Sequence, residues 1–351
     1  MAVSSSKSRK SSLMDGHRRQ RGRRRRQQRQ KQRRKRRIQS ACTAAPNAPP
    51  LFSSAPSSPF VLAPENVARI RESLGVDEKD DEALLSHLIK QAAIDRACPP
   101  ISRFHVGAAA LGSSGAVYLG VNVELTGAPL SQSIHGEQFV VANAFGHGER
   151  RIETLAVNEL PCGHCRQFLA ELEDRGSMCI FVTRQGLRTT HDELLPHAFT
   201  PDQLQEGGNV RYLLSAAPDA ALELSHSNGG DCDDLVQAAL EAAKKSYAPY
   251  SRCESGVALR LACGSILTGA YLESAAYNPS LPPLQVALVN TIIAGKGPAE
   301  SYDSEWSNIL DVVLVERAEA LVKQEDITRA VIAGIAPAAT FRVVSCTSTS
   351  R

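Results

Sequence analysis

One sequence pattern occurs twice in this chain, at an offset of 149 residues. Pro-Ile-Ser-Arg at 100–103 matches Pro-Tyr-Ser-Arg at 249–252. The same offset relates three further pairs of residues: Gly107 and Gly256, Gly120 and Gly269, and Glu124 and Glu273. The chain has 351 residues, which is long enough for two domains of ordinary size. The sequence therefore predicts two tandem copies of one fold.

The first copy alternates strands with helices. Apolar residues at helical spacing predict the helices, and apolar runs on either side of a Gly-Ser-Ser-Gly turn predict a hairpin. The predicted strands cover 104–111, 116–123, 154–157 and 178–182, and the predicted helices cover 80–97, 135–145 and 162–172. Strands that alternate with helices are typical of an α/β layer arrangement.

Four residues between 135 and 165 indicate a metal site. Glu137 follows His135 by two residues, and Pro161 precedes a Cys-x-x-Cys pair, Cys162 and Cys165. Zinc binds thiolates and imidazoles in a tetrahedron, and a catalytic zinc keeps its fourth corner open for water. Two cysteines three residues apart can reach one metal from the first turn of a helix, whose positive end favours thiolates. We therefore predict that His135, Cys162 and Cys165 bind a catalytic zinc ion.

Glu137 is the candidate acid–base residue of this site. Bound zinc lowers the pKa of water from about 15.7 towards about 7, and a nearby carboxylate can move the released proton to a substrate. A lone Cys-x-x-Cys is also typical of half a structural zinc site or of a redox pair. The sequence has no second Cys-x-x-Cys, and His164 lies between two residues that are already ligands. A redox pair would leave His135 and Glu137 unexplained.

These motifs resemble those of cytidine deaminases, specifically the long homodimeric form with two deaminase-like domains; His-x-Glu followed by Pro-Cys-x-x-Cys is a signature of zinc deaminases. The resemblance extends over about 64–344 and includes four further segments: 102–107, 120–124, 255–259 and 278–285. It implies that the Asn-x-Glu motif, which is Asn122, Val123 and Glu124, binds the ribose hydroxyls and that Phe104 packs by the base. One departure is Gly136, where relatives commonly have Ala; it removes no ligand.

The resemblance implies an α/β fold of two tandem cytidine-deaminase-like α/β/α domains, each a mixed sheet flanked by helices. The expected boundaries are 64–208 for the catalytic domain and 209–351 for a degenerate, non-catalytic repeat. The implied activity is zinc-dependent hydrolytic deamination of cytidine and deoxycytidine to uridine and deoxyuridine plus ammonia, in pyrimidine salvage. One Zn²⁺ per chain is expected, in the first domain.

The second copy lacks the chemistry of the first. With a one-residue deletion in the alignment, Pro283 takes the place of His135 and Gln285 that of Glu137, and no Cys-x-x-Cys follows. Proline does not bind zinc, and a neutral amide does not shuttle a proton. We therefore expect a quaternary role: a homodimer in which residues near 275–278 cover the active site of the partner. The alternative is that the second copy serves only as a folding partner.

Charge divides the chain into a basic tail and an acidic body. Residues 1–50 hold 17 of the 40 Lys and Arg but one of the 37 Asp and Glu, so the remainder has 23 basic and 36 acidic side chains, a net charge of −13. We expect residues 1–63 to form a disordered Arg-rich extension and a Pro/Ala/Ser linker. Such a tail fits an organelle transit peptide, a nuclear-localisation or nucleic-acid-binding arm, or a solvated tail. An intracellular protein of the cytosol, an organelle or the nucleus is expected.

Composition also bears on other classes of protein. No apolar run of eighteen residues occurs, so we expect no membrane span. Nine scattered cysteines, an odd number, argue against a secreted disulfide scaffold. A second hypothesis is an editing deaminase that the basic tail steers to nucleic acid, but the acidic body argues against a nucleic-acid groove except through that tail. A third is an inactive, zinc-stabilised scaffold, which the complete His135, Glu137, Cys162 and Cys165 set argues against.

Overall fold

The computed structural model describes residues 58, 60–90, 94–173, 175–205, 210–215, 219–225, 233–297 and 306–349. The Arg-rich tail and most of the expected linker lie outside these residues, so the expectations for 1–57 stay predictions. No helix in the described part of the chain is long and apolar enough to cross a membrane.

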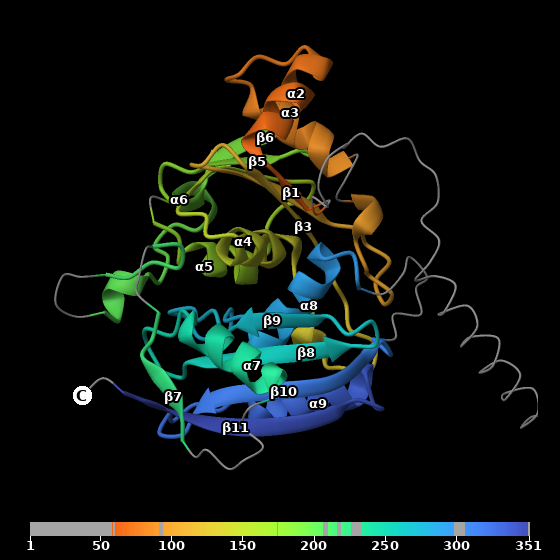
Figure 1. The fold of residues 1–351 in the computed structure, drawn as a ribbon. Helices are drawn as coiled ribbons and strands as arrows, with labels where there is room; N and C mark the ends of the chain where they lie inside the picture. Colours follow the sequence, from red (N-terminus) through yellow and green to blue (C-terminus); the bar gives the residue numbers. More distant parts are fainter. Residues whose placement is uncertain are drawn as a thin grey trace, which may run out of the picture. The chain divides into compact units, whose positions relative to one another are not determined.

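Two mixed sheets, one from each copy of the repeat, form the framework (Figure 1). The first has the order β1-β3-β2-β4-β5-β6, and the second has the order β7-β11-β10-β8-β9. Their strands are β1 (Val61–Leu62), β2 (Gly107–Gly112), β3 (Val117–Val121), β4 (Ile152–Val157), β5 (Cys179–Val182), β6 (Leu187–Thr190), β7 (Leu222–Leu224), β8 (Ser255–Leu261), β9 (Ile266–Ala270), β10 (Ile309–Arg317) and β11 (Thr340–Ser348). Each sheet has one parallel pair, β4 with β5 and β10 with β11, and its other pairs are antiparallel. The expected mixed sheets are confirmed.

Helices flank both sheets, as the α/β prediction requires. They are α2 (Pro64–Leu74), α3 (Asp81–Leu88), α4 (Gly136–Gly146), α5 (Gly163–Leu169), α6 (His191–Leu194), α7 (Asp234–Lys244), α8 (Pro283–Ile293) and α9 (Glu325–Ile335). Short 3₁₀ turns cover 94–96, 130–132 and 201–203. The helix predicted over 80–97 is shorter: it ends at Leu88, residues 91–93 lie outside the described part, and a 3₁₀ turn covers 94–96.

The repeated glycines explain how helices pack on the strands. A Cβ on Gly120 of β3 would overlap the carbonyl oxygen of Gly136, at the start of α4. A Cβ on Gly269 of β9 would overlap Pro283 at the start of α8 in the same way. Only glycine allows backbone to approach backbone this closely. The two contacts are copies of one another, so the 149-residue offset reflects a shared requirement of packing.

The same contacts correct the alignment of the two copies beyond β3. Gly136 corresponds to Pro283, and the N-cap of α4, His135, corresponds to the N-cap of α8, Pro282. The offset therefore falls from 149 at the strands to 147 at the helices. The loop before α8 is two residues shorter, and the predicted one-residue deletion is wrong. Glu137 then corresponds to Leu284, and Gln138 to Gln285.

Helices α4 and α8 contact one another and lie between the two sheets (Figure 1). Nearly every residue of both helices is buried, which is why neither shows a polar face. One apolar cluster includes Phe139 of α4, Leu288 of α8 and residues from both sheets. A smaller cluster lies under α7 around Val236 and Leu240. The two copies therefore share a continuous hydrophobic core.

Candidate active site

The three predicted metal ligands come together. His135, Cys162 and Cys165 each offer one ligand atom, and these atoms all lie within 4.8 Å of one another. The Nδ1 atom of His135 is 3.5 Å from the sulfur of Cys162 and 3.3 Å from that of Cys165. Within the described part of the chain, this is the group of His, Cys, Asp and Glu side chains that could hold a metal ion.

Local structure explains this convergence. His135 is the N-cap of α4 and Cys162 is the N-cap of α5, and the two helices pack against each other. Cys165 lies three residues further, in the first turn of α5, and is buried. Arg166 braces the segment before Cys162, because its Nε donates to the carbonyl of Pro161 and its Nη1 to the carbonyl of Leu194, both at 2.8 Å. The ligands therefore lie at the starts of two helices that pack together, and Arg166 holds the start of α5 in place.

The donor set and its protonation suit zinc. The thiol of Cys165 and then His135 form hydrogen bonds to Cys162 that lower its pKa to about 3. Donation to Cys162, followed by burial, raises the pKa of Cys165, and the hydrogen bond with Cys162 raises that of His135. The three side chains hydrogen-bond to one another around one point, and a divalent cation bound there would displace the protons that they share. Two sulfurs and one imidazole are the ligands of a zinc site with an open fourth position.

Glu137 lies in the first turn of α4, two residues after the ligand His135, and its side chain is buried. Its side chain is 4 % exposed, and burial raises the pKa of its carboxyl above the ordinary range. Hydrogen bonding with Cys165 and the charge of His135 act in the opposite direction. A buried carboxyl whose pKa moves towards neutrality can both accept and return a proton. This placement supports the predicted acid–base role of Glu137.

A pocket of about 410 Å³ lies over these groups, and a pocket of this size fits a small organic ligand. The predicted site residues among those that line it are Phe104, Asn122, Glu124, His135, Glu137 and Cys162. Cys165 is fully buried and does not line it. Val123 does not line it either: its side chain is fully buried. The backbone of Val123 pairs with that of Ile134, with both N–H···O distances at 2.8 Å, and so holds the Asn-x-Glu segment beside His135.

Asn122 and Glu124 brace the floor of the pocket as well as lining it. The Oε2 atom of Glu124 accepts hydrogen bonds from the amides of Ile101 and Ser102, both at 2.8 Å. The amide of Asn122 donates to the carbonyl of Phe104 at 2.8 Å and accepts from the amide of Val106 at 2.9 Å. A carboxylate has about four acceptor positions and an amide group two N–H donors. Both side chains therefore keep hydrogen-bonding capacity towards the pocket.

Some lining residues had no signal of their own in the sequence. Ser133, Ile134, Glu159 and Leu160 line the pocket because they directly precede the metal ligands. Leu160 and Phe104 are exposed at its rim, although both are large and apolar. The position of these four lining residues beside the two motifs could have suggested that they line the pocket, but their amino-acid types could not.

Comparisons with known proteins point to one family. Two models described as "Cytidine and deoxycytidylate deaminase zinc-binding region" match residues 78–181 and 191–329. Cytidine deaminase 1 of Arabidopsis thaliana is 40% identical over 305 residues, which are 82% of this chain and 97% of that protein. The chain belongs to the cytidine deaminase family. Another member, cytidine deaminase of Serratia proteamaculans, is 40% identical over 286 residues, 81% of this chain and 89% of that protein. The crystal structure of cytidine deaminase from Mycobacterium tuberculosis aligns at 34% identity over 34% of this chain and 97% of that one, with a TM-score of 0.31.

The family assignment confirms the predicted fold class of two tandem cytidine deaminase domains, and zinc as the family's metal.

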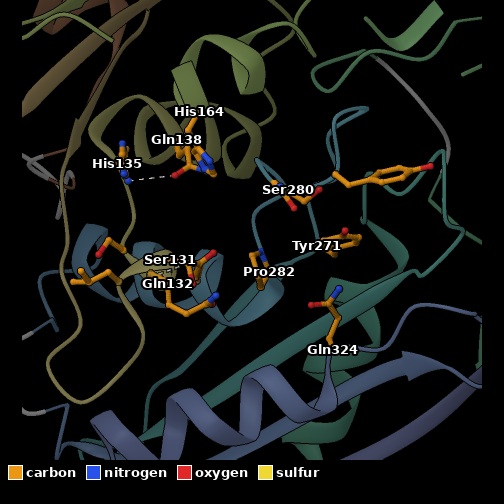
Figure 2. Close-up of a pocket in the computed structure, with 14 residues that line it drawn as sticks. Ser131, Gln132, His135, Gln138, His164, Tyr271, Ser280, Pro282 and Gln324 are labelled. Atoms are coloured by element: carbon orange, nitrogen blue, oxygen red, sulfur yellow. Dashed lines mark hydrogen bonds between the residues drawn. The ribbon is translucent and has the colours of Figure 1, made fainter. Parts of the chain in front are cut away.

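A second pocket, of about 650 Å³, lies between the two copies (Figure 2). His135, Gln138 and His164 line it from the first copy, and Tyr271, Ser280 and Pro282 line it from the second. Tyr271 and Pro282 occupy the positions that Asn122 and His135 have in the first copy, so the second copy does not repeat these two side chains.

Proposed function

We propose that this protein catalyses the zinc-dependent hydrolytic deamination of cytidine and deoxycytidine to uridine and deoxyuridine, with release of ammonia. One observation carries the proposal: His135, Cys162 and Cys165 converge beside the buried carboxyl of Glu137, on the wall of a pocket that Asn122, Glu124 and Phe104 also line. The names of the relatives, cytidine deaminases at about 40% identity, support it.

His135, Cys162 and Cys165 would hold the zinc, which when bound supplies the Lewis acidity that lowers the pKa of a water molecule. Glu137 then accepts a proton from the attacking water and delivers it to ring atom N3, which makes C4 more electrophilic. After attack at C4, the same carboxyl carries a proton to the exocyclic nitrogen, and ammonia leaves. The burial of Glu137 suits the first of these transfers, because it raises the pKa of the carboxyl and so makes the carboxylate a stronger base towards the attacking water.

The other pocket residues would orient the nucleoside. Asn122 and Glu124 would bind the ribose hydroxyls with the hydrogen-bonding capacity that their backbone contacts leave. Phe104, whose ring is exposed at the rim, would pack against the base. A site that grips free ribose hydroxyls in this way favours nucleosides over polynucleotides.

We also propose that the chain is a homodimer in which the second copy of the partner closes this pocket. The proposal is supported by the apolar side chains left exposed at the rim, Phe104 and Leu160, which a second copy would cover. Tyr277, in the segment expected to cover the partner's site, is also exposed. Domain boundaries at 64–208 and 209–351, with a non-catalytic second domain, are part of the same proposal.

A substrate panel tests the activity. Purified protein is incubated with cytidine, deoxycytidine, cytidine monophosphate and a single-stranded oligonucleotide, and ammonia and the uracil product are both measured. We expect turnover of the two nucleosides. Turnover of the oligonucleotide alone would support the editing-deaminase alternative, and the absence of ammonia with all four would refute the proposal.

A further inference from the structure

The chain reaches the metal ligand His135 through one surface loop, residues 125–133, which we call the delivery loop. The backbone pairing of Val123 with Ile134 closes this loop at its base. A 3₁₀ turn over Leu130–Gln132 forms its second half, and His135 follows it after two residues. The position of the delivery loop therefore affects the position of His135.

The second copy contacts the delivery loop at Gly127 and at Gln132. Gly127, at φ +90°, lies against Gly334 of α9 so closely that a Cβ on Gly127 would be 2.7 Å from the carbonyl oxygen of Gly334. Gln285 of α8, which is 4 % exposed, donates from Nε2 to the carbonyl of Gln132 at 2.8 Å. Both contacts come from the copy that lacks the metal ligands.

The contact made by Gln285 has a counterpart across the pseudo-symmetry of the repeat. Gln138 of α4 donates from Nε2 to the carbonyl of Pro279 at 3.1 Å. The 147-residue offset that relates α4 to α8 relates Gln138 to Gln285 and also Gln132 to Pro279. Each copy thus holds, with one glutamine, the loop that precedes the equivalent helix of the other. Gln138 also accepts a hydrogen bond from the amide of His135 at 3.3 Å, as Figure 2 shows.

We propose that Gln285 is a positioning residue for the zinc ligand His135, and that the second copy supports the metal site of its own chain through the delivery loop. Gln285 holds the second half of the delivery loop through Gln132, and Gly334 limits the position of its first half at Gly127. Because the backbone of Val123 pairs with that of Ile134, the residue before His135, a restrained loop also restrains the backbone of His135. The second copy then has a role within one chain, separate from covering the site of a partner. This inference rests on the proposed function only in taking His135 as a zinc ligand.

Two substitutions perturb the loop in different ways. Gln285→Met keeps the length and volume of the side chain but removes the donor. Gly334→Ala adds a Cβ that overlaps the carbonyl oxygen of Gly127 and so pushes the loop away. Alanine is otherwise favoured over glycine inside a helix, by about 1 kcal/mol, so weaker retention of zinc by this variant would be due to the overlap.

Asn290→Ala is the matched control. Asn290 lies on the same helix, α8, and its Nδ2 donates to the carbonyl of Thr268 at 2.7 Å. The substitution removes one hydrogen bond from a side chain to the backbone, as Gln285→Met does, but within the second copy and away from the delivery loop. It separates a general weakening of that copy from an effect on His135.

The readout is the rate at which the zinc-loaded enzyme transfers its metal to an excess of chelator, measured well below the temperature of unfolding. We expect Gln285→Met to accelerate transfer about five-fold, the factor that corresponds to about one buried hydrogen bond. Gly334→Ala should accelerate transfer by at least about as much, because overpacking costs about 1–3 kcal/mol. Asn290→Ala should leave the transfer rate within about two-fold of that of the unsubstituted enzyme, even if its melting temperature falls as much as those of the two loop variants. Unchanged rates in both loop variants, or an equal acceleration in Asn290→Ala, would overturn the inference.

The outcome is independent of the proposed activity. Zinc transfer is measured without substrate, so a protein that binds zinc but releases no ammonia from cytidine still tests the role of Gln285. If the unsubstituted protein turns over cytidine while all variants release zinc at its rate, the proposed function holds and the positioning role is refuted.

Discussion

Substitution of Tyr250 by Phe should destabilise the protein in a pH-dependent way, because Tyr250 helps to hold a buried carboxylate between the two copies. Glu171, just after α5, is fully buried and accepts hydrogen bonds from the hydroxyl of Tyr250 at 2.7 Å, the hydroxyl of Tyr247 at 3.0 Å and the amide of Ala275 at 2.6 Å. These three partners all belong to the second copy. Tyr250→Phe removes one of them without leaving a cavity.

The magnitude follows from the charge of the acceptor. A hydrogen bond to a charged group contributes about 1.5–3 kcal/mol, and two other donors remain on Glu171. We therefore expect the free energy of unfolding to fall by about 2 kcal/mol at about pH 8, where an ionised carboxylate needs its donors most.

The sign of the pH dependence follows from the direction of the shift. Burial raises the pKa of Glu171 above its unfolded value, so its contribution to stability is fully present below the unfolded pKa of about 4.3 and is lost as the pH rises through the folded pKa. The hydrogen bond from Tyr250 lowers the pKa of Glu171, so its removal raises that pKa further. The destabilisation should be smaller at about pH 5 than at about pH 8.

Urea unfolding of the zinc-loaded protein, at one protein concentration and both pH values, measures the effect. Leu321→Ala is the control, because Leu321 is 99 % exposed and its truncation should change stability by less than about 0.5 kcal/mol. An equal loss at both pH values, or a loss in Tyr250→Phe no larger than that in Leu321→Ala, would refute the reasoning.

Three further outcomes are expected. Cys165→Ser should lower the zinc retained after dialysis at least about ten-fold by metal analysis, whereas full retention would exclude Cys165 as a ligand. Gly269→Ala should reduce the free energy of unfolding by about 1–3 kcal/mol in urea, because its Cβ overlaps the start of α8; an unchanged midpoint would contradict that contact. A chain truncated after residue 225 should lose cooperative thermal unfolding, because α4 packs against α8 in the shared core; a truncated chain with full activity would contradict both the shared core and a role for the second copy.

The sequence identified the metal site and the fold class because their signals are local or repeated. Glu137 follows His135 by two residues and Cys165 follows Cys162 by three, and the strand glycines recur because backbone packing requires them in both copies. The alignment of α8 was missed by one residue, because the loop before it is shorter and the first turn of α8 shares little with that of α4. Only the paired N-caps and the Gly269 contact fix it.

Long-range contacts had no sequence signal. The hydrogen bond from Gln285 to Gln132 joins residues 153 positions apart, and neither residue type is distinctive. The packing of Glu171 beneath two tyrosines of the other copy is likewise a tertiary feature, which periodicity cannot predict. Val123 was grouped with the site because it lies between Asn122 and Glu124, but alternation along an extended segment turns its side chain into the core.

The central claim is that Glu137 moves protons beside a zinc ion held by His135, Cys162 and Cys165. The most direct test is the turnover of cytidine by Glu137→Gln, with zinc content measured on the same sample. We predict that this variant keeps its zinc and folds normally but loses about 10²–10⁴-fold in kcat, the usual contribution of an acid–base group. Normal turnover by the zinc-loaded variant would contradict the account.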